Sequence, residues 1–224
     1  PDYIGRSLGT LGGGNHFIEL DEDDQGYKYL VIHSGSRNLG VNVCNFFQHL
    51  AKKNVNRNEE RKRIIEDLKK YGLEKEINNT LRRLGTVPPD LAYLDGEDLD
   101  AYNFAANVCQ YFADDNRWNI AMPIIHGLQL SFVDFFTTSH NYFDIHSGII
   151  RKGAVRAEKD EQLIIPLNMR DGSLICRGKG NEDWLCSAPH GAGRLMSRNR
   201  AKETLNMEEY RQQMHDIYST SVCE

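Results

Sequence analysis

Two of the eight histidines in this sequence, His16 and His33, lie in segments that could bring their imidazoles together. Residues 15–20 alternate between polar and apolar side chains, as in a strand that exposes one face, and residues 27–33 are mostly apolar, as in a buried strand. The turn-rich residues 21–26 connect them, so the whole segment predicts a β-hairpin.

The register of this hairpin decides whether the two imidazoles meet. A turn centred near Asp24 and Gln25 pairs Leu20 with Tyr29 and places the two histidines directly opposite each other, with Cβ atoms about 5 Å apart. Imidazoles at that separation could bind one metal ion or two neighbouring ions. The alternative interpretation is that each histidine is a structural residue at a strand end.

A second candidate for chemistry is His190, which precedes the Gly-Ala-Gly sequence at residues 191–193. The glycines predict a loop that opens a helix, with Arg194 and Arg198 four residues apart on one helix face. The N-terminus of such a helix can bind an anion. A histidine at its mouth could act as a metal ligand, a general base or a nucleophile towards phosphorus. A capping loop without a ligand is the alternative.

Three further segments carry weaker signals. The glycine run at residues 12–14 could let backbone N–H groups approach a phosphate, or it could be a flexible turn. His140 follows an apolar stretch, and taken alone it is more typical of a structural histidine. The basic residues 151–154 predict a turn that either contacts phosphates or is simply solvated.

The remaining pattern predicts the elements that must position these residues. A helical pattern runs from Val41 to about Leu84 with an interruption at Gly72, and a second helix is expected from about Leu99 to Trp118. Because the helices gather between residues 41 and 138, the sequence predicts an α+β fold rather than a regular βαβ alternation.

Other details of these elements follow from the apolar residues. The second helix is expected to place Phe104, Val108, Tyr111 and Phe112 on its inner side. The apolar residues 128–136 fit a helix or a strand equally well. Short strands are expected around residues 149–150, 163–165 and 174–176, where glycine and proline separate apolar runs.

Composition narrows the class of protein. The 224 residues are 40% hydrophobic and 26% charged, which is typical of a globular chain with one large or two small domains. The net charge of −5 argues against a wholly basic nucleic-acid binder but leaves room for a local basic groove. No long apolar run or signal peptide is visible. Five cysteines without a CxxC pair favour a reducing compartment, so we expect a cytoplasmic protein.

Six motifs taken together resemble the RtcB family of RNA ligases. In chain order they are GTLGGGNHFIE (9–19), HSGSR (33–37), SHN (139–141), RKGA (151–154), PLNMRDGSL (166–174) and HGAGR with its trailing SR (190–198). The resemblance implies that residues 1–224 are a partial RtcB-like catalytic domain of mixed sheets with a mainly helical segment at 41–138. Asn168 stands where other members of the family have serine.

The resemblance also implies an activity. Enzymes of this family join RNA ends that carry a 2′,3′-cyclic phosphate or a 3′-phosphate to 5′-hydroxyl ends, in tRNA splicing and RNA repair. They use GTP as co-substrate and two Mn²⁺ ions as cofactor. RNA would therefore be the partner, as tRNA halves or broken RNA, with an archease-like activator as a further candidate and no membrane involved.

Individual roles follow from the same resemblance. His190 would attack the α-phosphorus of GTP and carry GMP, while His16, His33 and His140 would be manganese ligands. The guanylate pocket would be lined by Asn15, His16, Phe17, Ile18, Glu19, His140, Asn141, Pro166, Leu167, Asn168, Met169, Ser173, His190, Gly191, Ala192 and Gly193. RNA or triphosphate oxygens would be bound by Arg37, Arg151, Lys152, Arg194 and Arg198.

Two alternatives stay open at this point. In the family an upstream Asp and a bridging Cys complete the metal sites, and a Lys near the C-terminus contacts guanine; these match no residue of the present sequence. An incomplete fragment that binds nucleotide or metal without ligating is therefore one alternative. A metal-dependent phosphoesterase that activates water at the histidines is the other.

Overall fold

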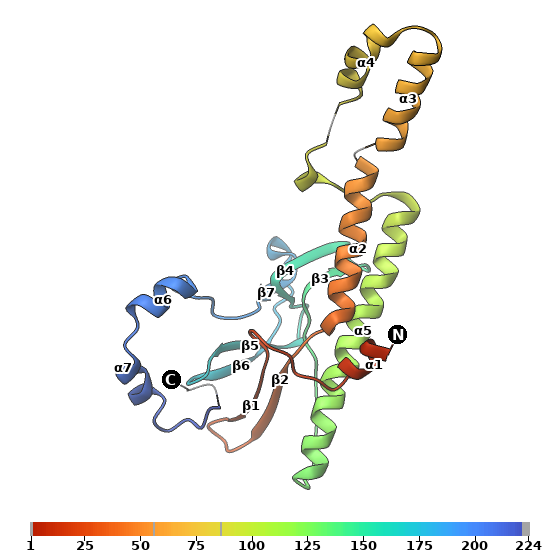
Figure 1. Ribbon diagram of the computed structural model, residues 1–224. Coiled ribbons are helices and arrows are strands. Elements are labelled where there is room, and N and C mark those ends of the chain that lie inside the picture. The colour runs from red at the N-terminus through yellow and green to blue at the C-terminus, as the bar shows by residue number, and fades with distance from the viewer. Residues whose placement is uncertain (1, 56, 86, 221–224) are drawn as a thin grey trace. The chain divides into compact units, whose positions relative to one another are not determined.

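The computed structural model describes residues 2–55, 57–85 and 87–220, and the chain divides into two compact units (Figure 1). The first unit consists of the residues up to Leu8 and Gly35–Asn116, and the second of Gly9–Ser34 and the residues from Arg117 onward. Helices together with small antiparallel sheets confirm the predicted α+β fold.

The first unit is helical. Its elements are α1 (Asp2–Ser7), α2 (Arg37–Val55), α3 (Asn58–Lys70), α4 (Ile77–Leu84), the short 3₁₀ turns η1 (Glu74–Glu76) and η2 (Pro89–Leu91), and the first part of α5 (Gly96–Gly127), whose last part belongs to the second unit. The predicted helical region from Val41 to Leu84 is thus three helices, and the predicted helix from Leu99 to Trp118 is longer at both ends.

Gly72 ends α3 for a reason that the sequence made visible. Its φ of 69° lies in the left-handed region that favours glycine. The N–H of Gly72 donates to the carbonyl of Lys69, and the N–H of Leu73 donates to that of Leu68. This is the Schellman arrangement, which satisfies the last carbonyls of a helix.

Helices α2 and α5 pack against each other in opposite directions within the first unit. Asn54 of α2 donates to Asp98 at the start of α5 (2.6 Å), and the fully buried Asn116 donates to the carbonyl of Gly35 (3.3 Å). Between these contacts the ring of Phe47 meets that of Tyr102 at 5.4 Å.

The predicted inner side of α5 was wrong for three of its four residues, since only Phe112 is half-buried. Phe104 and Tyr111 are 74% and 73% exposed, and Val108 is also exposed. The half-buried Tyr102 and the buried Cys109 and Asn116 follow one another at seven-residue spacing, and Tyr102 packs against Phe47 of α2, so this face is covered instead of the most aromatic one.

All the strands that the structure describes lie in the second unit. They are β1 (Phe17–Glu22), β2 (Lys28–His33), β3 (His140–Asp144), β4 (Ile149–Arg156), β5 (Gln162–Asn168), β6 (Gly172–Arg177) and β7 (Ser187–Pro189), followed by α6 (Arg198–Thr204) and α7 (Met207–Gln213). The three antiparallel sheets are β1-β2, β3-β4-β7 and β5-β6, and the turn η3 (Glu182–Trp184) precedes β7.

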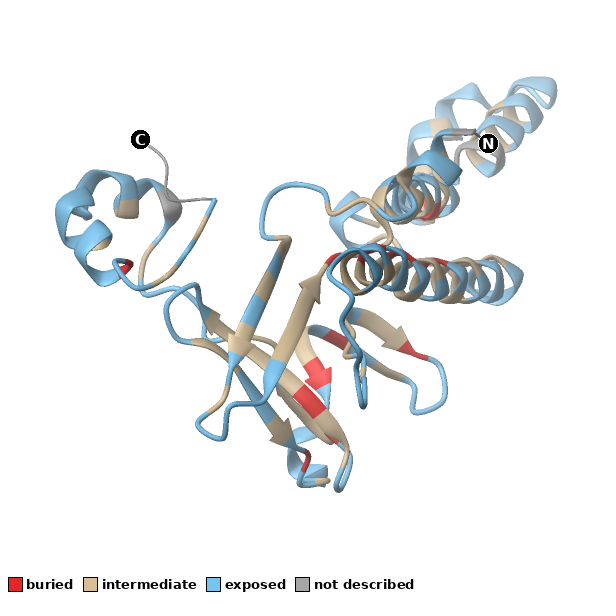
Figure 2. Ribbon diagram, turned by 90° about the horizontal axis from the view of Figure 1, so that it is seen from below, coloured by how far each residue is buried: buried red, intermediate tan, exposed pale blue. Residues whose placement is uncertain are grey.

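A small apolar core joins two of these sheets. Val155 of β4 and Leu163 of β5 are each 2% exposed and pack with Ala157, and Ile165, Cys176 and Ala188 cover them from β5, β6 and β7. Buried positions are otherwise few along the strands (Figure 2). The β3-β4-β7 and β5-β6 sheets are therefore held together close to the strand that leads to His190.

Residues 128–136 form neither of the two elements considered for them. After α5 the chain continues without helix or strand until His140. Phe132 and Phe135 instead gather around Trp118, with ring centroids 5.9 and 5.1 Å from the indole. Among the described residues, no helix combines the length and the apolar character that a membrane crossing needs.

Candidate active site

Four imidazoles form a row in the second unit. The ring of His33 lies 5.9 Å from that of His16 and 5.2 Å from that of His140, and the ring of His140 lies 4.8 Å from that of His190. They come from the loop before β1, the end of β2, the start of β3 and the residue after β7. The fold therefore brings together histidines that are up to 174 positions apart in the sequence.

The predicted register of the hairpin was wrong by one residue. Phe17 pairs with His33, and Leu20 pairs with Leu30. The reason is the loop: Asp23 N–H donates to the Tyr27 carbonyl, which leaves three loop residues ending in Gly26 with a φ of 85° instead of the two-residue turn that was expected.

His16 still reaches His33 because it lies outside the strand, where the alternation of strand faces does not apply. The carbonyl of Leu11, in the glycine-rich segment, accepts from His16 Nδ1–H at 2.8 Å and from the Ser34 hydroxyl at 2.8 Å. With the proton on Nδ1, the lone pair of His16 is on Nε2.

His190 directly follows β7, and its ring is held by β4, the strand that pairs with β7. Its Nδ1–H donates to the carbonyl of Gly153 (2.8 Å), and the N–H of Gly153 donates to the Asn141 side chain (2.6 Å). Pairing of Ala154 with Pro189 sets this geometry. The lone pair of His190 is therefore on Nε2, as a nucleophile requires.

Gly153 offers a direct test of this support. Its φ of 69° disfavours any other residue, and a Cβ there would lie 3.4 Å from the His190 ring. We expect Gly153→Ala to shift the carbonyl that orients His190 and to slow any reaction at Nε2 by about tenfold to a hundredfold. The rate at which His190 is covalently modified, followed by intact mass, measures this effect.

Gly148→Ala is the matched control. Gly148 has a φ of 68° and lies in the turn before the same strand, but nothing lies within 4 Å of a Cβ placed there. The two variants share the backbone strain and differ in the contact with His190. Equal rates for the two variants would contradict the orienting role of Gly153.

Burial lowers the pKa of His33 to about 4, and the pKa of His140 also falls below its usual range because of burial and the neighbouring His190. Nearby His140 and His16 add to the effect on His33. Both imidazoles are therefore neutral near pH 7, which is the form that binds a metal ion.

This shift predicts a pH dependence of stability for the metal-free protein. Because the folded-state pKa of His33 lies below its ordinary value of 6.5, protons bind more readily to the unfolded chain, and stability falls from about pH 6.5 down to about pH 4. We expect His33→Gln to lose less stability over this interval than the wild type does. Urea unfolding in EDTA at both ends of the interval measures it, and identical losses would contradict the assignment.

Glu19 lies on the same face of β1 as Asp21, next to β6. Its Oε1 accepts from the Ser173 hydroxyl at 2.9 Å. Burial raises the pKa of both carboxyl groups, and for Glu19 the neighbouring Asp21 adds to the rise. A cavity of about 400 Å³ lies beside them, lined by Asp21, Glu22, Asp23, Tyr29, Val31, Ile164, Ser173 and Ile175. Ile18, by contrast, lies on the opposite, exposed face of β1.

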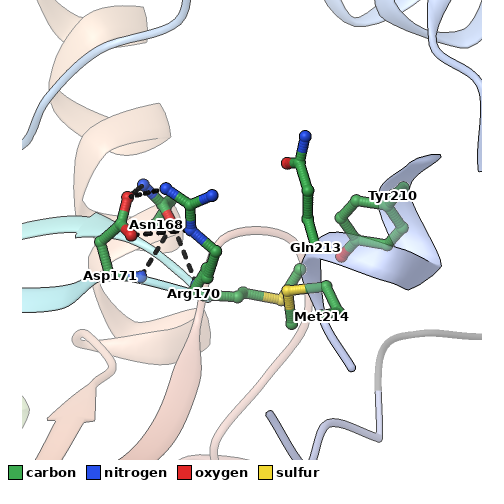
Figure 3. A pocket seen from close by; sticks show the side chains of 7 residues that line it. Asn168, Arg170, Asp171, Tyr210, Gln213 and Met214 are labelled. Carbon is green, nitrogen blue, oxygen red and sulfur yellow. Dashed lines mark hydrogen bonds and ion pairs between the residues drawn. The ribbon is translucent and has the colours of Figure 1, made fainter. Parts of the chain in front are cut away.

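A second cavity, of about 250 Å³, lies at the turn between β5 and β6. Figure 3 shows Asn168, Arg170 and Asp171 of this turn opposite Tyr210, Gln213 and Met214 near α7. Asn168 organises the turn: its carbonyl oxygen accepts from two backbone N–H groups and its amide donates to Asp171 at 2.7 Å. The exposed Met169 also lines this cavity.

Pro166 and Gly191 connect this hairpin to His190. The carbonyl of Pro166 accepts from the N–H of Ala192 at 3.2 Å. A Cβ on Gly191 would lie 3.3 Å from the same carbonyl oxygen, so a glycine fits this close approach. Leu167, Ser173 and the exposed Gly193 lie in or beside these same segments.

Arg151 is not the exposed basic residue that the sequence suggested. It lies in β4, is 2% exposed, and pairs with the buried Asp144 at 3.2 Å. Its other nitrogens donate to the Ser187 hydroxyl and the Leu185 carbonyl. The guanidinium is thus unavailable to a phosphate in this structure, whereas the neighbouring Lys152 is exposed.

The helix expected to begin at residues 191–193 was also placed wrongly. The chain is irregular from His190 to Ser197, and the helix begins at Arg198, where the Ser197 hydroxyl accepts from the N–H of Arg200. Arg194 is exposed in the irregular segment, and the side chain of Arg198 lies outside what the structure describes. Arg37 begins α2 in the first unit, with a φ of 55°.

Several residues at the site carried no signal in the sequence. Asp21, Tyr210 and Arg117 were not singled out, because an isolated Asp, Tyr or Arg has no characteristic spacing. Only the fold shows that Asp21 lies beside Glu19 and that Arg117 contacts the segments of two histidines. Cys223 lies outside the described residues, and the other cysteines are unpaired.

The imidazole row can be compared with what a divalent metal ion needs from its ligands. Within the described part of the chain, no group of three or more His, Cys, Asp or Glu side chains is arranged to hold a metal ion. Neutral imidazoles are common ligands of divalent transition-metal ions. The Nδ1 atom of His140 is buried without a hydrogen-bond partner among those residues, as expected for a ligand atom. His16, His33 and His140 thus lie in one row without being arranged, in this structure, as the ligands of a single ion.

Comparison with known proteins identifies the family to which the chain belongs. The chain matches the family model described as tRNA-splicing ligase RtcB over residues 3–224. It is similar to RNA-splicing ligase RtcB1 of Escherichia coli (strain ATCC 25922), with 34% identity over 223 residues that cover 91% of this chain and 49% of the relative. No solved structure matches the chain.

More distant relatives carry similar names. The tRNA-splicing ligase RtcB of Aeropyrum pernix is 28% identical over 253 residues, covering 89% of this chain and 47% of the relative. The RNA-splicing ligase RtcB homolog 2 of Entamoeba dispar is 24% identical over 253 residues, covering 98% and 44%. The chain thus spans about half the length of the curated relatives it matches.

Proposed function

The chain belongs to the RtcB family, and on this premise we propose that it carries the nucleophile and part of the metal site of a GTP- and Mn²⁺-dependent RNA ligase. The observation that carries the proposal is the row of imidazoles that ends in His190, with Nδ1–H of His190 held by the Gly153 carbonyl. The names of the relatives support ligation of RNA in splicing.

In the first step His190 Nε2 attacks the α-phosphorus of GTP. A P–N bond forms, the bond from the α-phosphorus to the bridging oxygen breaks, and pyrophosphate leaves. The attacking ring gains positive charge, and the Gly153 carbonyl that accepts its Nδ1–H at 2.8 Å stabilises that charge. The same hydrogen bond places the single proton of the neutral ring on Nδ1 and leaves the lone pair on the attacking Nε2.

In the second step the 3′-phosphate of an RNA attacks the phosphorus carried by His190, so the P–N bond breaks and the RNA end is activated with GMP. A cyclic phosphate is first opened by water. The 5′-hydroxyl of the other RNA end then attacks the activated 3′-phosphate, and GMP leaves. Imidazole suits this role because it is both a competent nucleophile and a competent leaving group near pH 7.

Manganese is proposed as the cofactor, with His16, His33 and His140 among its ligands. When bound, it would offset the negative charge of the phosphates near the attacking groups. The low pKa of His33 keeps that imidazole neutral and available for binding at physiological pH.

Glu19 is proposed to select guanine. An ionised Glu19 can accept hydrogen bonds from the N1–H and amino group of guanine, a pattern that adenine does not present. The Ser173 hydroxyl, which donates to Glu19 at 2.9 Å, fixes the direction of the carboxylate. Asn15, Asn141, Pro166 and Met169 remain proposed parts of the same pocket.

The exposed cations are proposed to bind RNA or triphosphate oxygens. Lys152 lies one residue before the glycine that orients His190, and Arg194 follows the same histidine by four residues. Arg37, which is half-buried in the first unit, and Arg198 are proposed for the same role. An archease-like activator and a cytoplasmic location belong to the same proposal.

The test is intact mass after incubation with GTP and Mn²⁺, followed by peptide mapping. We expect the added mass of one GMP on the peptide that contains His190, and none with ATP. Release of phosphate without an adduct would favour the phosphoesterase alternative. Absence of both would contradict the proposed chemistry for this chain.

A further inference from the structure

Arg117, in the part of α5 that belongs to the second unit, contacts the segments of two histidines at once. One guanidinium nitrogen, Nη1, donates to the carbonyl of Ser34 at 3.2 Å, and the other, Nη2, donates to the Thr137 hydroxyl at 2.7 Å. Ser34 directly follows His33, and Thr137 precedes His140 by three residues.

Through Ser34, Arg117 is also connected to His16. Ser34 is 8% exposed, and its hydroxyl donates to the Leu11 carbonyl at 2.8 Å. The same carbonyl accepts the Nδ1–H of His16 at 2.8 Å. Arg117, Ser34 and Leu11 therefore form a continuous chain of hydrogen bonds that ends on His16.

We propose that Arg117 is a positioning residue that fixes the spacing of His33 and His140. Two donors at the ends of one rigid plane set both the distance and the angle between the two segments, which a single-point cation such as lysine does not do. The inference rests on the proposed function, in which these histidines bind manganese. Groups that orient the ligands of a metal typically contribute about 10- to 100-fold in affinity.

These hydrogen bonds connect the segments that carry neighbouring histidines of the row. Of the three histidines proposed to bind metal, His33 lies in the middle. Its ring is 5.9 Å from that of His16 and 5.2 Å from that of His140. The segment after His33 receives Arg117 at the Ser34 carbonyl and is tied to Leu11 through the Ser34 hydroxyl. Losing the guanidinium removes the bond that ties Thr137, and with it the segment before His140, to this framework.

The experiment compares Arg117→Gln, Arg117→Lys and Thr137→Val with the wild type. The first readout is metal-free: the nuclear Overhauser effect between the ring protons of His33 and His140 in histidine-labelled protein. The second is the affinity for Mn²⁺ alone, followed by the electron paramagnetic resonance signal of the free ion. Arg156→Gln is the matched control, since Arg156 forms an exposed ion pair with Glu161 in the same unit.

We expect Arg117→Gln and Arg117→Lys to lose the contact between the rings and to bind Mn²⁺ about 10- to 100-fold more weakly. Thr137→Val keeps the bond to Ser34 and should weaken binding less. Arg156→Gln should change neither readout. If Arg117→Gln fails to fold, Thr137→Val still tests the link, because it removes only one hydroxyl.

Unchanged ring contacts in Arg117→Gln and Thr137→Val would overturn the positioning role. If the wild-type protein shows the ring contact but binds no Mn²⁺, the metal assignment of the proposed function is contradicted. The ring contacts of the wild type and the variants, compared without metal, still decide the role of Arg117. The two failures are thus distinguishable.

Discussion

His190→Ala is expected to abolish the GMP adduct, with a loss of at least about a thousandfold in the rate of its formation. Nε2 of His190 is the atom proposed to form the bond to phosphorus, and its lone pair is defined by the hydrogen bond from Nδ1 to Gly153. Alanine supplies no nucleophile, so no adjustment of the surroundings restores the bond. Intact mass measured over time after addition of GTP and Mn²⁺ gives the rate.

The neighbouring His140 makes peptide mapping part of this experiment. Its ring lies 4.8 Å from that of His190, close enough to be considered as a substitute nucleophile. An adduct that persists in His190→Ala and maps to His140 would reassign the nucleophile. His215→Ala is the control, because the side chain of His215 is 76% exposed in the same unit and should leave the rate unchanged.

The hairpin shows how far local sequence patterns reach. The alternation in residues 15–20 and the turn residues were sufficient to place two antiparallel strands, and the structure has them. The register depended on a loop closed by Asp23 and Tyr27 with Gly26 at a positive φ, and composition does not distinguish this loop from a two-residue turn. The two imidazoles meet because His16 precedes the strand.

Helix α5 shows why a helical pattern does not determine which face is buried. Residue types favoured the face with Phe104 and Tyr111, yet the helix buries Cys109 and Asn116, and Tyr102 contacts Phe47 of α2. Which face meets another helix depends on a partner more than forty residues away in the sequence. The burial of Arg151 has the same origin, since Asp144, Ser187 and Leu185 become its neighbours only through the β3-β4-β7 sheet.

Arg151→Met is expected to give the largest loss of stability among substitutions in the second unit that we consider. Arg151 is 2% exposed and its partner Asp144 is 7% exposed, so methionine leaves a buried carboxylate without its cation. It also leaves the Leu185 carbonyl without its donor. Removing one member of a buried ion pair costs about 3–5 kcal/mol. Urea unfolding followed by tryptophan fluorescence measures this cost, because Trp118 and Trp184 both lie in the second unit.

Arg156→Met is the matched control on the same strand. Arg156 pairs with Glu161 at 2.8 Å, but its side chain is 48% exposed, so the free energy of unfolding should change by less than about 1 kcal/mol. Similar losses in the two variants would show that the Arg151 pair contributes no more than a surface pair.

The pH dependence adds an independent check on Arg151→Met. Burial alone would raise the pKa of Asp144, but hydrogen bonds from Ser147, His146 and Arg151 hold it below its ordinary value of 3.8. A carboxyl group with a lowered pKa stabilises the folded state at neutral pH, and this contribution disappears as the pH falls through its folded-state pKa. The difference between wild type and Arg151→Met should therefore narrow in acid, where Asp144 of the variant becomes protonated. A difference that stays constant with pH would mean that lost packing, and not the unpaired charge, destabilises the variant.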